Sequence, residues 1–74
     1  MPKSDTEKWE AAEEGIELLR SGEVDDALTA LLKAVTEDPL NEYAHHFLGH
    51  AYFDKEAYPE ALKCYVAALE LAPD

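Results

Sequence analysis

Apolar residues recur at steps of three and four positions along most of the chain, and no stretch alternates at period two. Such spacing is typical of amphipathic helices and disfavours strands. The first predicted helix covers residues 5–21. Ser4 and Glu7 have the spacing of a capping box at its start, and Gly22 suits a C-terminal cap. The chain therefore opens with a helix whose two ends are both marked in the sequence.

Three further helices are predicted along the rest of the chain. The second begins at residue 24 or 25 and ends at residue 37, since Pro39 disfavours helical geometry in the residue before it. The third covers residues 41–55. The fourth begins near Pro59, at a first turn that needs no backbone donor, and stops before Pro73. The connections are only a few residues long, so consecutive helices are expected to pack antiparallel in an all-α fold.

The sequence repeats itself with a period of 34 residues. A shift of this length superposes five identical residues, namely Gly15 on Gly49, Ala27 on Ala61, Leu28 on Leu62, Ala34 on Ala68 and Pro39 on Pro73. Small residues at such positions let the two helices of a hairpin approach closely, while large apolar residues fill the space between them. The period therefore predicts one helical hairpin used twice.

The second unit resembles the tetratricopeptide repeat, a 34-residue helix–turn–helix with the signature W-x₂-L-G-x₂-Y, A-x₃-F, A and P. Residues 42–74 carry the signature as His45-x₂-Leu48-Gly49-x₂-Tyr52, Ala61-x₃-Tyr65, Ala68 and Pro73, with histidine in place of the first aromatic residue. Residues 8–41 match less closely, as Ala11-x₂-Glu14-Gly15-x₂-Leu18, Ala27-x₃-Leu31, Ala34 and Pro39. The resemblance implies two hairpins, stacked as a short right-handed solenoid after a lead-in of residues 1–7.

The resemblance also implies that the first helix of each hairpin lines a concave surface that holds a peptide or a partner helix. It assigns to this surface Trp9, Ala12, Glu13, Ile16, Leu19, Arg20, Tyr43, His46, Phe47, His50, Phe53 and Asp54. Spacing supports the set independently, because Tyr43, His46 and His50 follow at steps of three and four and share one helix face. Aromatic residues supply much of the binding energy at interfaces. Ile16 and Phe47 either contact the ligand or belong to the core between the repeats.

The net charge of the chain disfavours some classes of binding partner. Seventeen acidic residues against six basic ones give a net charge of −11. This balance opposes binding to nucleic acid or to anionic lipid, and no apolar run approaches the length of a membrane span. A basic or apolar protein or peptide partner is favoured, unless Glu10, Glu14 and Glu17 only solvate a helix face. The polar N-terminal residues lack the apolar stretch of a signal peptide, which favours a cytoplasmic protein.

Within the tetratricopeptide repeat family, some members hold the acidic tail of heat-shock chaperones through basic and amide side chains on the concave surface. Among the positions assigned to that surface here, Arg20 is the single basic residue, and it lies beside Glu13 and Asp54. The resemblance therefore implies that this particular binding function is absent.

Few residues offer catalytic or metal-binding chemistry. His46 and His50 are four residues apart and can reach one ion, but zinc usually takes three or four protein ligands, so packing or ligand contact is expected for both. Cys64 is the lone cysteine and is expected to be a structural thiol. No glycine-rich phosphate loop or catalytic triad is present. The sequence predicts no enzyme, no metal and no cofactor, although the histidines suit a pH-sensitive contact.

The last predicted helix leaves an apolar edge, with Tyr52, Leu62, Val66 and Leu69 as its candidate residues. Solenoids use polar capping units for solubility and about three repeats for stability. Either further repeats follow in a longer protein, or the edge is covered by self-association, for example in a two-fold homodimer or by exchange of a hairpin. We favour self-association because two repeats bury little surface. The predicted function is non-catalytic protein–protein interaction, with a self-associating assembly module as the alternative.

Overall fold

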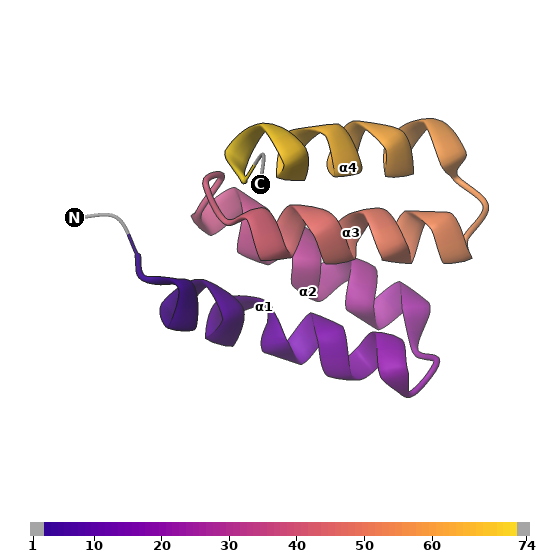
Figure 1. The fold of residues 1–74 in the computed structure, drawn as a ribbon. Helices are drawn as coiled ribbons and strands as arrows, with labels where there is room; N and C mark the ends of the chain where they lie inside the picture. The colour runs from indigo at the N-terminus through magenta and orange to yellow at the C-terminus, as the bar shows by residue number, and fades with distance from the viewer. Residues whose placement is uncertain (1–2, 73–74) are drawn as a thin grey trace.

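The computed structural model describes residues 3–72, and this part of the chain forms four α-helices and no strand (Figure 1). The helices are α1 (Asp5–Arg20), α2 (Val24–Glu37), α3 (Glu42–Asp54) and α4 (Tyr58–Leu71). The predicted all-α fold of antiparallel hairpins is confirmed. Residues 21, 41 and 55 are caps rather than helical residues, and Pro73, the last position of the predicted repeat signature, lies outside the described residues.

The ends of α1 follow the signals in the sequence. The Ser4 hydroxyl accepts a hydrogen bond from the Glu7 backbone N–H at 3.2 Å, and the Glu7 carboxylate accepts one from the Ser4 backbone N–H at 3.1 Å. These reciprocal bonds form the expected capping box. After α1, Gly22 has a φ of +82°, a conformation that glycine adopts without steric cost. The matching turn between α3 and α4 places Glu56 at a φ of +60°.

Each hairpin brings two helices together across a glycine. A Cβ atom built on Gly49 would lie 2.8 Å from Cε1 of Tyr65, and one built on Gly15 would overlap the side chain of Leu31. Only a residue without a side chain permits this approach. The shift of 34 residues superposes Gly15 on Gly49 and Leu31 on Tyr65, so the same crossing occurs twice.

The core lies where α3 packs against both α1 and α2 (Figure 1). Its buried side chains are Ala12, Ile16, Ala27, Leu31, Ala34, Ala44, Leu48 and Ala51. Within the described residues α4 packs against α3, on the side opposite to the first hairpin. The two faces of α3 are thus both occupied, whereas α4 is covered on one side. Among residues 3–72, no helix has the length and apolar character needed to cross a membrane.

Candidate functional site

Aromatic and histidine rings connect α1 with α3 on the surface of the molecule. The Trp9 ring packs edge-on against the rings of Tyr43 at 5.4 Å and Phe47 at 5.8 Å between centroids. His46 lies 5.1 Å from Phe47 and 5.3 Å from His50. The steps of three and four residues along α3 place its four rings on one face, as the spacing predicts. We call Trp9, Tyr43, His46, Phe47 and His50 the ring cluster.

A small hollow lies beside the ring cluster, between the C-terminal halves of α1 and α3. Its volume is about 240 Å³, and its lining consists of Ile16, Leu19, Arg20, Phe47, His50 and Asp54. All six positions belong to the surface expected from the sequence. Arg20 pairs with Glu17 at 2.9 Å, and both side chains remain well exposed, so the guanidinium is available at the rim. The smaller hollow therefore combines an apolar floor with charged edges.

A larger hollow of about 600 Å³ opens on the other side of the ring cluster. Its lining residues are Trp9, Glu42, Tyr43, His46, Phe47, Tyr65, Ala68, Leu69 and Ala72. The last four belong to α4 and its C-cap, which the sequence did not assign to the binding surface. Tyr65 joins the ring cluster from α4, with its centroid 5.7 Å from that of His46. Its place in the A-x₃-F segment marked it for packing rather than for a surface role.

Three of the expected residues line neither hollow, namely Ala12, Glu13 and Phe53. Glu13 is exposed outside both hollows, and Phe53 packs its ring on Tyr58 at 5.2 Å instead of joining the ring cluster. Ile16 is 3 % exposed and Ala12 is 1 % exposed, so both belong to the core. Phe47 is half-buried and lines both hollows, which combines the two roles left open for it.

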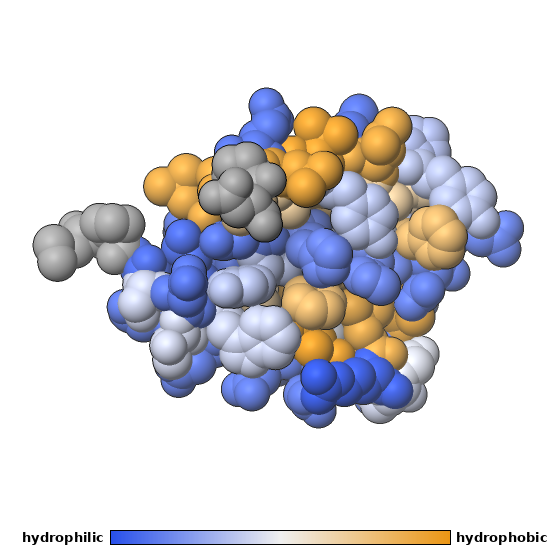
Figure 2. All heavy atoms as spheres, viewed as in Figure 1, coloured by the Kyte–Doolittle hydropathy of each residue, from blue (hydrophilic) through white to orange (hydrophobic). Residues whose placement is uncertain are grey.

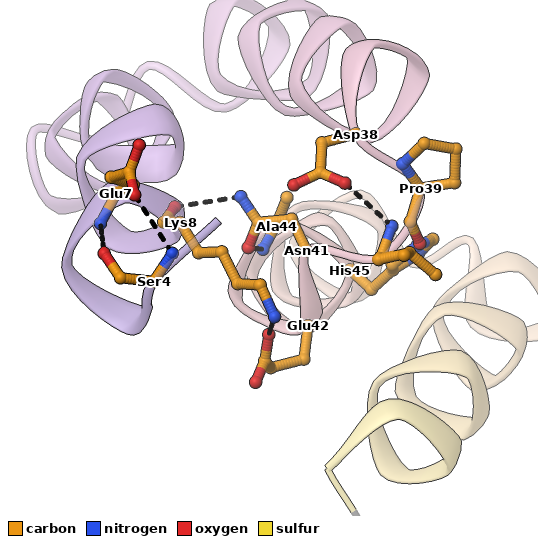
Figure 3. Close-up of polar contacts among 10 residues, drawn as sticks. Ser4, Glu7, Lys8, Asp38, Pro39, Asn41, Glu42, Ala44 and His45 are labelled. Carbon is orange, nitrogen blue, oxygen red and sulfur yellow. Dashed lines mark hydrogen bonds and ion pairs between the residues drawn. The ribbon is translucent and has the colours of Figure 1, made fainter. Parts of the chain in front are cut away.

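A buried asparagine joins the two hairpins at the start of α3 (Figure 3). The Asn41 amide donates to the backbone carbonyl of Lys8 at 2.9 Å, and its side-chain oxygen accepts from the backbone N–H of Ala44 at 3.2 Å. The Lys8 ammonium lies 3.2 Å from the Glu42 carboxylate, with both side chains largely shielded from water. An asparagine before an apolar run signals a helix start, but its contact with Lys8 was not foreseen.

Burial changes the titration of three groups near these surfaces. It lowers the pKa of His46, as does the nearby charge of His50, so both effects favour the neutral form of the His46 imidazole. Burial also raises the pKa of Tyr65 and the pKa of Cys64. The Cys64 thiol is therefore protonated at neutral pH, a poor state for a nucleophile.

Within residues 3–72 no group of three or more His, Cys, Asp or Glu side chains is placed to hold a metal ion.

The apolar edge predicted on α4 is exposed. Leu62, Val66 and Leu69 are 64 %, 45 % and 63 % exposed, and they follow one another at steps of four and three. Figure 2 shows apolar residues gathered over α4, at the top of the view. Tyr52, the fourth candidate, is half-buried and packs against the core. We call Leu62, Val66 and Leu69 the α4 row.

Known proteins share the pattern of these hairpins. A family model described as tetratricopeptide repeat matches residues 42–74. Tetratricopeptide repeat protein 37 of Xenopus laevis is 35% identical over 69 residues, or 93% of this chain. Superkiller complex protein 3 is 33% identical over 69 residues in Homo sapiens (93% of this chain) and 34% identical over 67 residues in Mus musculus (90%). The matched segment is 4% of each relative, so the chain spans a small part of their length.

Three findings agree on the family. The structure contains two helical hairpins related by the 34-residue period, the family model covers the second hairpin, and the relatives match across both. Tetratricopeptide repeats generally mediate protein–protein interactions and are typically non-catalytic. The chain belongs to the tetratricopeptide repeat family.

Proposed function

We propose that this chain is a non-catalytic, cytoplasmic module that binds a peptide or helix of another protein on the surface formed by α1 and α3. The observation that carries the proposal is the ring cluster, a connected set of partly exposed rings beside the smaller hollow. Exposed aromatic clusters of this kind are typical of binding surfaces, because rings offer large contact areas at low entropic cost. The family supports the same role, since its repeats bind protein partners.

The chemistry of the surface defines the ligand. An apolar side chain fits the smaller hollow against Phe47, while Arg20 and Asp54 at its edge offer one hydrogen-bond donor group and one acceptor group. The net charge of −11 favours a basic or neutral ligand by long-range attraction. Two relatives bear the name of a superkiller complex protein, which supports a role within protein assemblies.

Peptide selection followed by affinity measurement tests the proposal. Peptides are selected on the full chain from a phage-displayed random library, and their Kd values are measured by fluorescence anisotropy. His50→Ala is expected to weaken binding about tenfold, since interface residues of this kind cost about 1 kcal/mol or more when truncated. Lys63→Ala, an exposed change on α4, is the matched control and should leave Kd unchanged. Equal affinity for His50→Ala and the wild type would contradict the proposed surface.

Self-association through the α4 row is the alternative function. The exposure of Leu62, Val66 and Leu69 favours it, because a two-fold dimer would pair this row with the same row of a second copy. Light-scattering mass across a wide dilution series tests it. A dimer that Leu62→Glu converts to a monomer would support assembly, whereas a monomer at every concentration would exclude it.

A further inference from the structure

The larger hollow of the second hairpin repeats the surface of the first hairpin on which α3 packs. The shift of 34 residues converts Trp9, Ala12, Leu31, Ala34 and Val35 into Tyr43, His46, Tyr65, Ala68 and Leu69, all of which line the larger hollow. In the first hairpin these positions contact α3 or belong to the core that α3 completes. The larger hollow is thus shaped like the place where one more helix would pack.

Exposure distinguishes the two equivalent surfaces. Leu31 is fully buried and Val35 is half-buried under the cover of the second hairpin. Their counterparts are more open, since Tyr65 is half-buried and Leu69 is 63 % exposed. The second surface therefore exposes apolar area that the first one buries, and covering this area would be favourable.

The packing of α3 defines what fits such a surface. The residues of α3 that pack against the first hairpin are Ala44, Leu48 and Ala51, which are 0 %, 3 % and 0 % exposed. Two small residues let the helix approach closely, and the leucine between them fills the remaining space. A helix that occupies the larger hollow in the same pose needs this pattern of small, large and small residues.

A second copy of this chain cannot supply that helix by head-to-tail stacking. The positions of α1 that correspond to Ala44, Leu48 and Ala51 are Glu10, Glu14 and Glu17, and all three glutamates are exposed. Burial of three unpaired carboxylates against an apolar surface is strongly unfavourable. The α1 helix of a second copy is therefore excluded as the occupant of the larger hollow.

Charge specifies one further position of the occupant. At the joint between the hairpins, Lys8 of the first pairs with Glu42 of α3 at 3.2 Å. In the second hairpin Glu42 takes the place of Lys8, so the same pose brings an acidic group against the first turn of the incoming helix. A lysine or arginine on that turn would share the Glu42 carboxylate with Lys8, and the net charge of −11 acts in the same direction.

We propose that the larger hollow binds one amphipathic helix of a partner protein with the pattern basic–x–small–x₃–Leu–x₂–small. This pattern is that of residues 42–51 with the charge at the first position reversed. The larger hollow lies mainly on α3 and α4, with Trp9 of α1 at its edge. It shares Trp9, Tyr43, His46 and Phe47 with the ring cluster, but only Phe47 with the smaller hollow of the proposed function. The partner helix would pack on the second hairpin in the same way as α3 packs on the first.

A synthetic helix derived from α3 tests the proposal. The probe is the peptide of residues 41–55 with Glu42→Lys, held helical by a covalent staple on the face away from Leu48, because isolated short helices are unstable in water. Its new lysine would lie near the Lys8–Glu42 ion pair in the larger hollow. The equivalent site on the first hairpin is already occupied by α3, which directs the probe to the hollow. Fluorescence anisotropy with the full chain is expected to show saturable binding. The same peptide with Ala44, Leu48 and Ala51 changed to glutamate is expected not to bind.

Two leucines of α4 provide a matched pair of variants. Leu69→Glu changes a residue that lines the larger hollow, whereas Leu62→Glu changes one of nearly equal exposure that lies outside it. We expect Leu69→Glu to weaken probe binding at least about tenfold and Leu62→Glu to leave it unchanged, with both variants folded by circular dichroism. His50→Ala should bind the probe normally, because His50 does not line the larger hollow. This readout separates the proposal from the function proposed for the smaller hollow.

Three outcomes would overturn the proposal. The first is no saturable binding of the lysine probe, or equal binding of the glutamate control. The second is an equal loss of binding in Leu62→Glu and Leu69→Glu, which would assign the contact to the α4 row as a whole. The third is a wild-type dimer, seen by light scattering, that Leu69→Glu dissociates and Leu62→Glu does not, since a second copy would then occupy the hollow.

Discussion

Glycine sets the distance between the helices of each hairpin. A Cβ atom on Gly49 would lie 2.8 Å from Cε1 and 2.9 Å from Cδ1 of Tyr65, far inside van der Waals contact. The absence of that atom allows the ring to pack against the α3 backbone and to reach His46 and His50 on the surface. A packing residue in the hairpin thus shapes the larger hollow.

Replacement of this glycine should separate α3 from α4. We expect Gly49→Leu to lower the free energy of unfolding by about 1–3 kcal/mol or more, because overpacking forces side chains and backbone apart. Urea denaturation measures the change. Lys63→Leu, which adds a leucine on the exposed side of the same hairpin, should leave the transition nearly unchanged. An unaltered transition for Gly49→Leu would be incompatible with the close helix approach.

Protonation of His46, a member of the ring cluster, makes the stability of the fold depend on pH. Its folded-state pKa lies below the ordinary value of 6.5, because of burial first and the charge of His50 second. The unfolded chain therefore binds a proton at a pH where the folded chain does not. This group contributes stability that is present above 6.5 and is lost as the pH falls below that value.

Stability measured against pH tests this coupling. As the pH falls from about 7 to 5.5, the free energy of unfolding of the wild type should decrease relative to that of His46→Asn, whose side chain does not titrate. Comparison of the two proteins removes the common effect of the many carboxylates. Urea denaturation at each pH gives both curves, and parallel curves would refute the depressed pKa of His46.

At the scale of elements, α3 is the structural joint of the molecule. It packs against α1 and α2 on one side and against α4 on the other. Asn41 fixes its start, because one side chain caps α3 through the Ala44 N–H and also holds the Lys8 carbonyl of α1. The orientation of the ring cluster relative to Trp9 depends on this joint.

An isosteric change isolates the contact between hairpins. Asn41→Asp keeps the acceptor that caps α3 but loses the amide donor to the Lys8 carbonyl. We expect the free energy of unfolding to fall by about 1–3 kcal/mol, since a buried polar group is left without its partner. Asp54→Asn, which exchanges a carboxylate and an amide at an exposed position, is the control and should have little effect on urea denaturation. Equal stability of Asn41→Asp and wild type would contradict the role of the joint.

The helices themselves follow from local signals. The capping residues Ser4 and Gly22 and the punctuation by Pro39 and Pro59 are local in sequence, so the element boundaries could be predicted closely. The hairpin pairing followed from the 34-residue period. The hydrogen bond of Asn41 could not be predicted in this way, because its partner Lys8 lies 33 positions away and no periodic pattern indicates such a bond.

At the scale of the whole molecule, the two ends of the stack differ in chemistry. The outer face of α1 presents Glu10, Glu14 and Glu17, whereas the outer side of the second hairpin presents the larger hollow and the α4 row. The acidic end is suited to water and the other end to a partner. The described residues therefore present one acidic end and one largely apolar end.

The candidate binding surface could be predicted only in part from the sequence. Helix spacing placed Tyr43, His46 and His50 on one face, and the structure does so. Spacing does not define the rotation of α4 about its axis, so the contribution of Tyr65 and its neighbours to the larger hollow was missed. Phe53 does not join the ring cluster, because its ring packs against that of Tyr58. This contact depends on the turn between α3 and α4.

We propose that α1 and α3 together form the protein-binding surface. The most direct measurement is the ¹H–¹⁵N NMR spectrum of the full chain, titrated with a peptide selected on it. We expect shifts concentrated at Leu19, Arg20, His50 and Asp54 around the smaller hollow. Shifts confined to α2, or to the α4 row, would contradict it.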